Sequence, residues 1–312
     1  MKYLGIIYCI IILNIISCKD LFFSGVQGKK SCGMKISVPD PKDPLQGMIE
    51  IPEGSNEIGT NPLYPEEGPP RIVHVNKFRM DKTDVTNLQF SEFVKASGYL
   101  TTAERRTPPS SIVFIDRPQG VDLGNPSQWW EIVKGATWKT PMGEGSDIQG
   151  KEEFPVVHIS LEDALAYARW IGHDLPTEIE WEYAARGGKT GNHFVWGNTN
   201  HDEGVAKANI WEGIFPILDK GKDGFKAQSS PVGCYSPNDF GLFDMAGNVW
   251  QWTKDDYSEK GKFEPDKAVI KGGSFLCADS YCKRYRPSAR VGAEKTEGTS
   301  HIGFRTVYRK NQ

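Results

Sequence analysis

This sequence lacks the features that mark several large classes of protein. It carries 37 Lys and Arg against 40 Asp and Glu, so its net charge of −3 offers no basic surface for nucleic acid. It has no internal repeat, no low-complexity tract and no apolar run long enough to cross a membrane comfortably. What remains is ordinary globular composition, 38% hydrophobic and 25% charged, enough for one large domain or two small ones.

Cysteine and histidine are scarce, and neither is spaced for a common metal site. The six cysteines are Cys9, Cys18, Cys32, Cys234, Cys277 and Cys282. The last two have a C-x4-C spacing, which matches neither the C-x2-C zinc knuckle nor the thioredoxin-like redox pair. The six histidines show no H-x3-H arrangement, which argues against a three-histidine iron site. From the residues alone, a disulfide is the simplest role for the C-x4-C pair, and Cys32 with Cys234 is another possible pairing.

The N-terminus has the form of an export signal. In "MKYLGIIYCIIILNIISCKD" a lysine precedes an apolar run over residues 3–16. The following Ser17-Cys18 completes a stretch that resembles a bacterial lipoprotein cleavage box, in which Cys18 becomes the lipidated first residue. An ordinary secretory signal with a chance cysteine is the alternative. We expect a signal over 1–18, a tether over 19–46, and an exported protein of the bacterial periplasm or cell envelope whose only membrane contact is the lipid anchor at Cys18.

Alternation and capping patterns predict an α+β domain over residues 47–312. "GMIEIPEGSNEIGT" alternates as strands do, and "RIVHVNKFRMDKTDV" is expected to form a second strand pair. Three helices are predicted by capping boxes, which are Thr86 with Gln89, Ser160 with Asp163, and Thr177 with Glu180. Residues 190–312 offer no long periodic stretch, so little regular structure is expected there.

Five stretches in a fixed order carry a family resemblance. They are "LPTEIEWEYAARGG" (175–188), "VWGN" (195–198), "GLFDMAGNVWQWTKD" (241–255), "KGGSF" (271–275) and "GFR" (303–305). Together they resemble the sulfatase-modifying-factor superfamily, also called the formylglycine-generating-enzyme-like domain. The resemblance implies one α+β domain, a C-type-lectin-like variant with low regular secondary structure. Because iron sulfoxide synthases, motility lipoproteins and ligand-binding members share the fold, membership alone does not imply an activity.

The discriminating stretch is "GGSFLCADSYCKRYRPSAR", residues 272–290. It fills every position of the frame GGS-aromatic-x-C-x-x-S-Y-C-x-R-Y-R-x-x-A-R, which is typical of aerobic formylglycine-generating enzymes. The resemblance implies copper(I) bound by Cys277 and Cys282. It also implies oxidation, with O2, of a cysteine in a C-x-P-x-R motif of a sulfatase polypeptide to Cα-formylglycine. The residues are compatible, because soft thiolates select Cu(I) over Mg, Ca or Mn, and the nearby Arg284, Arg286 and Arg290 would favour thiolates.

The resemblance gives catalytic roles to three more residues and leaves one position open. Ser274 is expected near the metal, Trp250 in the wall of the site, and Arg290 within it. The alternatives are a turn hydroxyl, core packing and a structural ion pair, respectively. His301 stands where the family often has Asn, and is either a tolerated substitution or a polar contact near copper. The wall that receives the substrate arginine is not identified, and the acidic residues considered for it are Asp255, Asp256 and Asp279.

Two loops resemble the calcium loops of the family. In the first, the matching ligands are Asn209, Ile210, Asp223 and Phe225. In the second, they are Asp244, Gly247, Val249 and Gln251. Oxygen ligands, several of them backbone carbonyls, suit a structural Ca2+. The alternative for both is a loop with ordinary Asx turns.

The leading hypothesis is therefore a copper- and O2-dependent formylglycine-generating oxidase that activates sulfatases. The alternative is a non-catalytic lipoprotein of the same fold that serves as a scaffold or motility component. The lipoprotein-like N-terminus favours the alternative, and the complete cysteine frame argues against it.

Overall fold

The computed structural model describes residues 32–310, apart from positions 39, 41, 118–121, 123, 126–127, 202–203 and 260. The expected signal with Cys9 and Cys18, and the first part of the expected tether, lie outside the described residues. Within the described part, no helix is long and apolar enough to cross a membrane. Contacts divide the chain into Met1–Cys32 and Gly33–Gln312, and the second unit holds every element named below.

The domain begins with four strands, and their pairing differs from one expectation from the sequence. Strands β1 (Met48–Ile51) and β2 (Gly54–Ile58) form one arm, and β3 (Arg71–Val75) and β4 (Phe78–Asp81) form the other. Strand β1 pairs with β4 and β2 pairs with β3, so the second arm is not a strand pair of its own. Alternation predicted the strands but could not choose their partners, because register depends on contacts between distant segments. Strand β13 (Val307–Tyr308) adds to β4.

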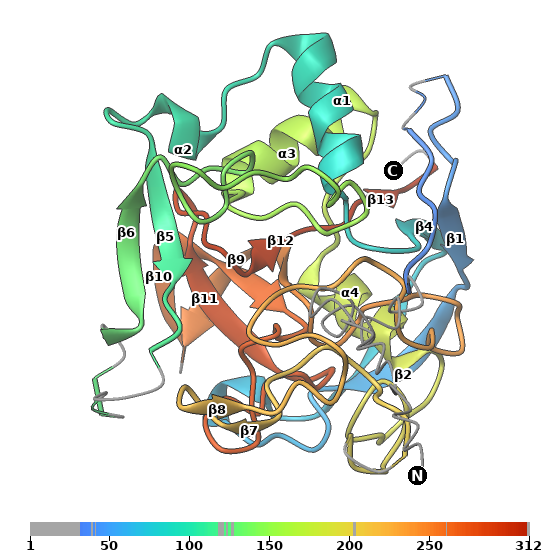
Figure 1. Ribbon diagram of the computed structural model, residues 1–312. Helices are drawn as coiled ribbons and strands as arrows, with labels where there is room; N and C mark the ends of the chain where they lie inside the picture. The colour runs from blue at the N-terminus through green and yellow to red at the C-terminus, as the bar shows by residue number, and fades with distance from the viewer. Residues whose placement is uncertain are drawn as a thin grey trace, which may run out of the picture. The chain divides into compact units, whose positions relative to one another are not determined.

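The helices follow their capping boxes. Helices α1 (Asn87–Ser97), α3 (Leu161–Trp170) and α4 (Glu178–Arg186) begin after Thr86, Ser160 and Thr177, and in each the cap side chain accepts a backbone N–H three residues on. Helices α1 and α4 end at Gly98 and Gly187 in the left-handed conformation that glycine tolerates. A short α2 (Thr102–Arg105) was not expected. Helices α1 and α3 lie side by side, as Figure 1 shows.

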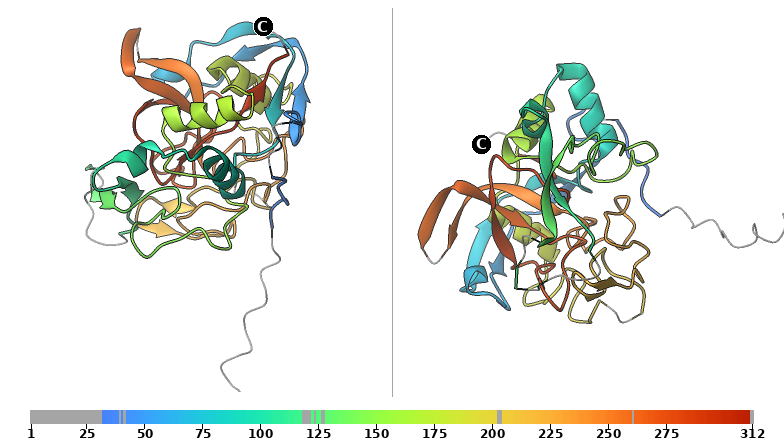
Figure 2. Two further views of the ribbon diagram at one scale, coloured as in Figure 1. Left: turned by 90° about the horizontal axis from the view of Figure 1, so that it is seen from above. Right: turned by 60° about the vertical axis from the view of Figure 1, so that its left-hand side comes forward.

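The C-terminal half contains the two longest strands of the described chain, contrary to expectation. Strands β9 (Trp250–Glu259) and β10 (Lys262–Lys271) join β11 (Arg290–Glu294) and β12 (Ile302–Gly303) in the order β11-β10-β9-β12. Figure 2 shows the far ends of β9 and β10 reaching out from the body. Sequence periodicity missed them because the last four residues of β10 are all buried and bulges interrupt the β9–β10 pairing.

The remaining elements are short, and the expected α+β class is confirmed. They are the 3-10 turn Pro65–Glu67, β5 (Ser110–Phe114), β6 (Trp130–Lys134), β7 (Gly213–Ile214) and β8 (Leu218–Asp219). The β5–β6 ribbon lies beside the four-stranded sheet in Figures 1 and 2, and Ile112 bridges to Thr299. The stretch 272–290 is the connection from β10 to β11.

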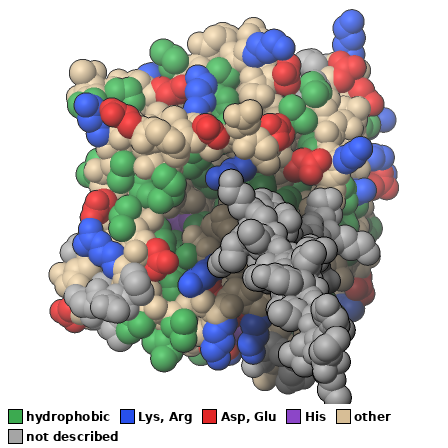
Figure 3. Space-filling view, in the orientation of Figure 1, with side chains coloured by type: hydrophobic (Ala, Val, Ile, Leu, Met, Phe, Trp, Pro, Cys, Tyr) green, Lys and Arg blue, Asp and Glu red, His purple; other side chains and the backbone are tan. Residues whose placement is uncertain are grey.

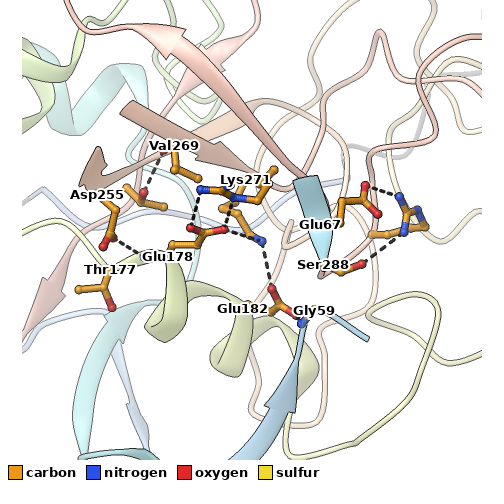
Figure 4. A network of polar contacts seen from close by, with 12 residues as sticks. Gly59, Glu67, Thr177, Glu178, Glu182, Asp255, Val269, Lys271 and Ser288 are labelled. Atoms are coloured by element: carbon orange, nitrogen blue, oxygen red, sulfur yellow. Dashed lines mark hydrogen bonds and ion pairs between the residues drawn. The ribbon is translucent and has the colours of Figure 1, made fainter. Parts of the chain in front are cut away.

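Both ends of that connection are tied to α4 by ion pairs, of which the one at Lys271 is buried and the one at Arg290 is partly exposed. Lys271 is fully buried, and its Nζ lies 3.2 Å from Glu182 Oε2 and 3.8 Å from Glu178 Oε1. Arg290 donates to both oxygens of Glu178, at 2.7 and 3.1 Å. Figure 4 shows the Lys271 ammonium between the two carboxylates of α4. These pairs fix where the cysteine-bearing loop leaves and re-enters the sheet.

Candidate functional site

Two glycines turn the chain out of β10 and allow a close approach. Gly272 and Gly273 have φ values of 95° and 74°, in the left-handed region that other residues avoid. A Cβ on Gly273 would meet Arg284 O and the Tyr285 backbone at 3.0 Å. The loop therefore folds back over its own start, which brings the second cysteine toward the first.

Cys277 and Cys282 face each other as free thiols. Their sulfur atoms are 3.1 Å apart, which is longer than a disulfide and close enough for an S–H···S contact. Cys277 N donates to Ser274 O at 2.9 Å, and Cys282 N donates to Ala278 O at 3.0 Å. These two tight turns hold the sulfurs together. Cys32 and Cys234, by contrast, are both disulfide-bonded.

The two thiols differ in their ease of ionisation. Burial, and then the contact with Cys282, raise the pKa of Cys277 well above that of an ordinary thiol. The hydrogen bond from Cys277 lowers the pKa of Cys282, and the positive charges of Arg284 and Arg286 lower it further. Cys282 is therefore the more acidic thiol of the pair, and the hydrogen bond from Cys277 stabilises its ionised form.

Alkylation tests this asymmetry. In metal-free protein, Cys282 is expected to react with iodoacetamide before Cys277, with its rate midpoint at a lower pH than for an ordinary thiol, because the thiolate is the nucleophile. Arg284→Gln should move the midpoint to higher pH, and Arg284→Lys should keep it. Peptide mass spectrometry of the alkylated protein measures both rates. Faster reaction at Cys277 would contradict the assignment.

A cleft of about 870 Å³ opens over Cys282, between the β5–β6 ribbon and the four-stranded sheet. Its walls are mostly apolar and aromatic, with charges of both signs. The lining residues include Tyr64, Glu66, Trp130, Trp250, Tyr257, Glu259, Tyr281, Cys282, Arg284, Gly292 and His301. Figure 3 shows the face seen in Figure 1 hollowed near its centre, with hydrophobic side chains around a histidine. The reactive thiol therefore faces a space that a short peptide can enter.

The predicted catalytic residues divide between this cleft and the layer behind it. Trp250 lines the cleft, whereas Cys277 and the fully buried Ser274 lie behind its surface. Ser274 Oγ accepts a hydrogen bond from Leu276 N at 3.2 Å, which supports the turn that carries Cys277. Arg290 lies outside the lining, where it pairs with Glu178 and donates to Ser258 O at 3.0 Å. The geometry gives Arg290 an ion-pairing role rather than contact with the thiols.

The two tyrosines of the motif have different places. Tyr281 lines the cleft, is 46% exposed, and stacks on Phe215 with ring centroids 4.7 Å apart. Tyr285 is fully buried, donates its hydroxyl to Asp279, and stacks on Phe194. Tyr281 therefore belongs to the cleft wall and Tyr285 to the core.

His301 lies in the cleft. Its ring packs on Trp130 with centroids 4.8 Å apart, and its Nδ1 is 2.6 Å from Thr299 Oγ1. The Nε2 atom has no hydrogen-bond partner among the described residues. Burial, with a small effect of His158, lowers the pKa of His301 to about 3, so the ring is neutral near pH 7. His301 thus gives the cleft an uncharged polar atom. The backbone N–H of Trp250 donates to the His301 carbonyl at 2.8 Å.

The acidic residues considered for the substrate arginine do not line the cleft. Asp255 accepts from Glu178 N, Asp256 pairs with Lys295, and Asp279 binds Tyr285, His201 and Lys283. The carboxylates in the wall are instead Glu66, which pairs with Arg284, and Glu259. Neither carries a local sequence signal, because both are distant in sequence from the cysteines they accompany.

The first calcium-like loop has oxygen atoms of the kind that a hard cation binds. Asp223 accepts N–H groups from Ile210 at 3.1 Å and from Phe225 at 2.9 Å. Burial raises the pKa of Asp223 to about 7, and the neighbouring carboxylates of Glu212 and Asp219 add to the rise. Asn209 donates its Nδ2 to Gln228 O, which leaves the amide oxygen as a possible ligand. A cation would offset the repulsion between these neighbouring carboxylates. Glu212 and Asp219 belong to this acidic group, and the sequence analysis did not predict them.

The second calcium-like loop fits less well. Asp244 Oδ1 is buried without a partner among the described residues, which is the kind of atom a cation would satisfy. Gln251 Oε1, however, accepts from Trp181 Nε1 at 2.6 Å and from Arg305 Nε at 2.8 Å. Both lone pairs of that oxygen are in use, so Gln251 does not fit the ligand role, and Arg305 already places a positive charge there. Gly247 and Val249 offer only carbonyl oxygens.

No group of three or more His, Cys, Asp or Glu side chains in the described residues converges as a metal site. A metal at any of these positions must therefore use two side chains, backbone carbonyls or a ligand from a bound molecule. The cysteine pair fits a soft monovalent ion, because it offers two sulfur donors and little else. The first calcium-like loop fits a hard divalent ion for the opposite reason.

Comparison with known proteins gives this geometry a family. The model of the sulfatase-modifying factor enzyme 1-like domain matches residues 34–310. The formylglycine-generating enzyme of Mycobacterium tuberculosis is 41% identical over 294 residues, which cover 84% of this chain and 98% of that protein. Among solved structures, PvdO from Pseudomonas aeruginosa has a TM-score of 0.60 at 23% identity, covering 84% of this chain and 94% of that one. At that identity, PvdO shows the fold alone.

Relatives named as formylglycine-generating enzymes and a relative named as inactive are almost equally similar to this chain in sequence. The inactive C-alpha-formylglycine-generating enzyme 2 of Bos taurus is 40% identical over 271 residues, covering 83% of this chain and 86% of that protein. Overall identity therefore does not decide the activity, and the residues of the site must. The fold is settled by the match over nearly all of the described residues: this chain belongs to the family of the sulfatase-modifying factor enzyme 1-like domain.

Proposed function

We propose that this chain is a formylglycine-generating oxidase that converts a cysteine in a C-x-P-x-R motif of sulfatase polypeptides to Cα-formylglycine, and so activates them. The observation that carries the proposal is the pair of free thiols 3.1 Å apart, one of which faces a peptide-sized cleft. Relatives named formylglycine-generating enzyme at about 40% identity support it. A purely structural cysteine pair in an exported protein would more simply be oxidised.

Copper(I) is the proposed resident ion, held by Cys277 and Cys282. When bound, it would supply a centre that accepts a further thiolate and reacts with O2. Cys282, the more acidic of the two thiols, faces the cleft, Cys277 is buried behind it, and Ser274 supports the turn between β10 and Cys277. Trp250 and Tyr281 line the same cleft as Cys282 and would form its aromatic wall around a bound peptide.

The reaction balances with one molecule of O2 and an external reductant. The C–S bond and one C–H bond of the substrate cysteine break, a C=O bond forms, and the sulfur leaves as hydrogen sulfide. The second oxygen atom leaves as water, with two protons and two electrons from two external thiol groups, which become a disulfide. The chain's contribution is to hold the substrate sulfur beside Cys282 and away from bulk solvent.

Coexpression with a sulfatase tests the function in cells. A sulfatase produced alone in a host without such an enzyme should keep its cysteine, and coexpression with this chain should convert it to the aldehyde. Digestion and mass spectrometry of the sulfatase peptide measure the conversion. The alternative, a non-catalytic lipoprotein of the same fold, predicts an unchanged cysteine in both cultures.

We propose that His301 contacts the substrate through Nε2. His301→Phe, which keeps the ring beside Trp130 but removes the polar atoms, is expected to lower kcat/KM about tenfold or more through loss of one buried hydrogen bond. His301→Asn restores a polar group and should retain most of the activity. Because the pKa of His301 is lowered to about 3, wild type and the Asn variant should share one pH profile between about 5 and 8. A fully active Phe variant would contradict the contact.

We propose structural Ca2+ at the first loop, with Asn209, Asp223 and the carbonyls of Ile210 and Phe225 as ligands. Chelation is expected to lower the melting temperature, and added Ca2+ to restore it, because an ion bound only by the folded state stabilises that state. Asp223→Asn should abolish the calcium-dependent part of the shift, whereas exposed Asp239→Asn should keep it. Differential scanning fluorimetry measures the shift. An Asp223→Asn variant that responds to Ca2+ like wild type would rule out this loop.

We also propose that the protein is exported and lipid-anchored at Cys18, on the basis of its N-terminal sequence. Metabolic labelling with a radioactive fatty acid should mark the wild-type protein, and Cys18→Ala should remove the label. Label retained in the variant would overturn the anchor without affecting the proposed reaction.

A further inference from the structure

Strand β11 is an edge strand of the four-stranded sheet, and its free edge faces away from β10. Its register pairs Gly292 with Val269 and Val291 with Ile270. Just beyond the strand, Lys295 N donates to Asp266 O at 2.9 Å, in the same register. Bonding to the partner strand alternates along an antiparallel ladder. The odd-numbered residues therefore bond to β10, and Gly292 directs its N–H and C=O to the free edge.

The free edge is closed on both sides of Gly292. The Arg290 carbonyl accepts from Arg284 Nη1 at 2.9 Å, and the Glu294 carbonyl accepts from Glu297 N at 3.0 Å. The N–H and C=O of Gly292 have no partner among the described residues, although edge groups of this kind are normally covered. Gly292 also lines the cleft that contains Cys282.

Residue 292 has to be glycine here, and its backbone is held in place. A Cβ at this position would lie 2.4 Å from Cδ1 of Tyr257, so the tyrosine ring fills the space of a side chain. The Arg290 guanidinium lies over the same ring, 5.0 Å from its centroid. The strand therefore presents the bare N–H and C=O of one residue to the cleft, as glycines do where another backbone approaches.

We propose that the substrate polypeptide binds as a short extended strand that hydrogen-bonds to the N–H and C=O of Gly292, with its cysteine at Cys282. The inference rests on the proposed function, since it takes the occupant to be the cysteine-bearing peptide. Extended peptides commonly add to exposed sheet edges through main-chain bonds, which tolerate variation in side chains. A second copy of this chain fits less well, because the capped carbonyls of Arg290 and Glu294 leave an opening only one residue long.

A backbone scan of the substrate tests the pairing. The probe is a synthetic Leu-Cys-x-Pro-Ser-Arg peptide with serine in place of its cysteine, extended by two residues at each end, so that binding is measured without reaction. Each N–H is methylated in turn, and affinity is read from the fluorescence of the cleft tryptophans. One methylation is expected to weaken binding about tenfold or more, while its immediate neighbours, whose N–H groups point away, change it less than about twofold. Replacement of the same amide by an ester should reproduce the loss without added bulk.

The outcomes separate this inference from the proposed function. A flat scan, or equal losses at every position, overturns the strand pairing even if the cysteine peptide is converted. The expected scan with no conversion of the cysteine peptide leaves the pairing intact and rejects the reaction. Hydrogen exchange adds an independent measurement, since the bound peptide should protect the Gly292 amide. A concentration-dependent dimer that the peptide dissociates would assign the edge to a second copy and overturn the proposal.

Discussion

Cys282→Ser is expected to abolish formation of formylglycine while leaving the fold intact. Cys282 lines the cleft, and its pKa is lowered by the hydrogen bond from Cys277 and by the charges of Arg284 and Arg286. A serine hydroxyl stays protonated at any working pH and is a hard ligand, so it replaces neither the nucleophilic thiolate nor the soft ligand that the proposed copper(I) needs. Loss of one member of a unit that acts together removes nearly all of its effect.

The neighbouring Ser280→Ala provides the control for this loop. Ser280 is exposed and bonds to Gly213 O at 3.0 Å, so its loss disturbs the same turn without touching a thiol. Turnover of the Ser280→Ala variant should stay within about threefold of wild type. Cys277→Ser should be as inactive as Cys282→Ser, because it removes the partner sulfur. Full turnover by either cysteine variant would reject the two-thiol site.

Glu182→Gln is expected to cost about 3–5 kcal/mol of stability, because it leaves buried Arg186 without its carboxylate and Lys271 with only the more distant Glu178. Glu182 Oε1 accepts from Arg186 Nη2 at 2.7 Å, and Oε2 lies 3.2 Å from Lys271 Nζ. Arg186 is 2% exposed and Lys271 is fully buried. Lys271 directly precedes the glycine turn that begins the cysteine-bearing loop. The variant should therefore also lose activity under conditions in which it is still folded.

Exposed Glu162→Gln is the matched control, since Glu162 also pairs with an arginine but is 55% exposed. Its effect on the free energy of unfolding should be within about 1 kcal/mol. Urea denaturation followed by tryptophan fluorescence measures both variants. Adding Lys271→Met to Glu182→Gln should recover part of the loss if an unpaired buried charge is its cause. Equal costs for Glu162→Gln and Glu182→Gln would contradict the role of burial.

Local signals predicted the parts of the fold that depend on local chemistry. The capping threonines and serine placed three helices, because a cap acts on backbone groups three residues away. The cysteine frame was equally visible, since both sulfurs come from one loop of the chain. The length of β9 and β10 was missed because a strand end buried on both faces has no alternation to detect.

Roles that depend on distant partners could not be predicted. Arg290 has the same sequence context whether it lines the cleft or pairs with Glu178, which is 112 residues away. Trp130 and Glu66 carry no motif, and only the fold brings them to the walls of the cleft around Cys282. His301 was noticed because it departs from the family pattern at a fixed distance from the final GFR, but its contact with Trp130 required the structure.

The most direct test of the central claim is conversion of a peptide by the purified chain. The protein is loaded with Cu(I) and mixed with a Leu-Cys-x-Pro-Ser-Arg peptide, O2 and a reducing thiol, and the mass of the peptide is followed. The account predicts an aldehyde product that requires both O2 and copper and that Cys282→Ser does not form. An unchanged peptide mass, under conditions in which the relative from Mycobacterium tuberculosis converts the same peptide, would contradict it.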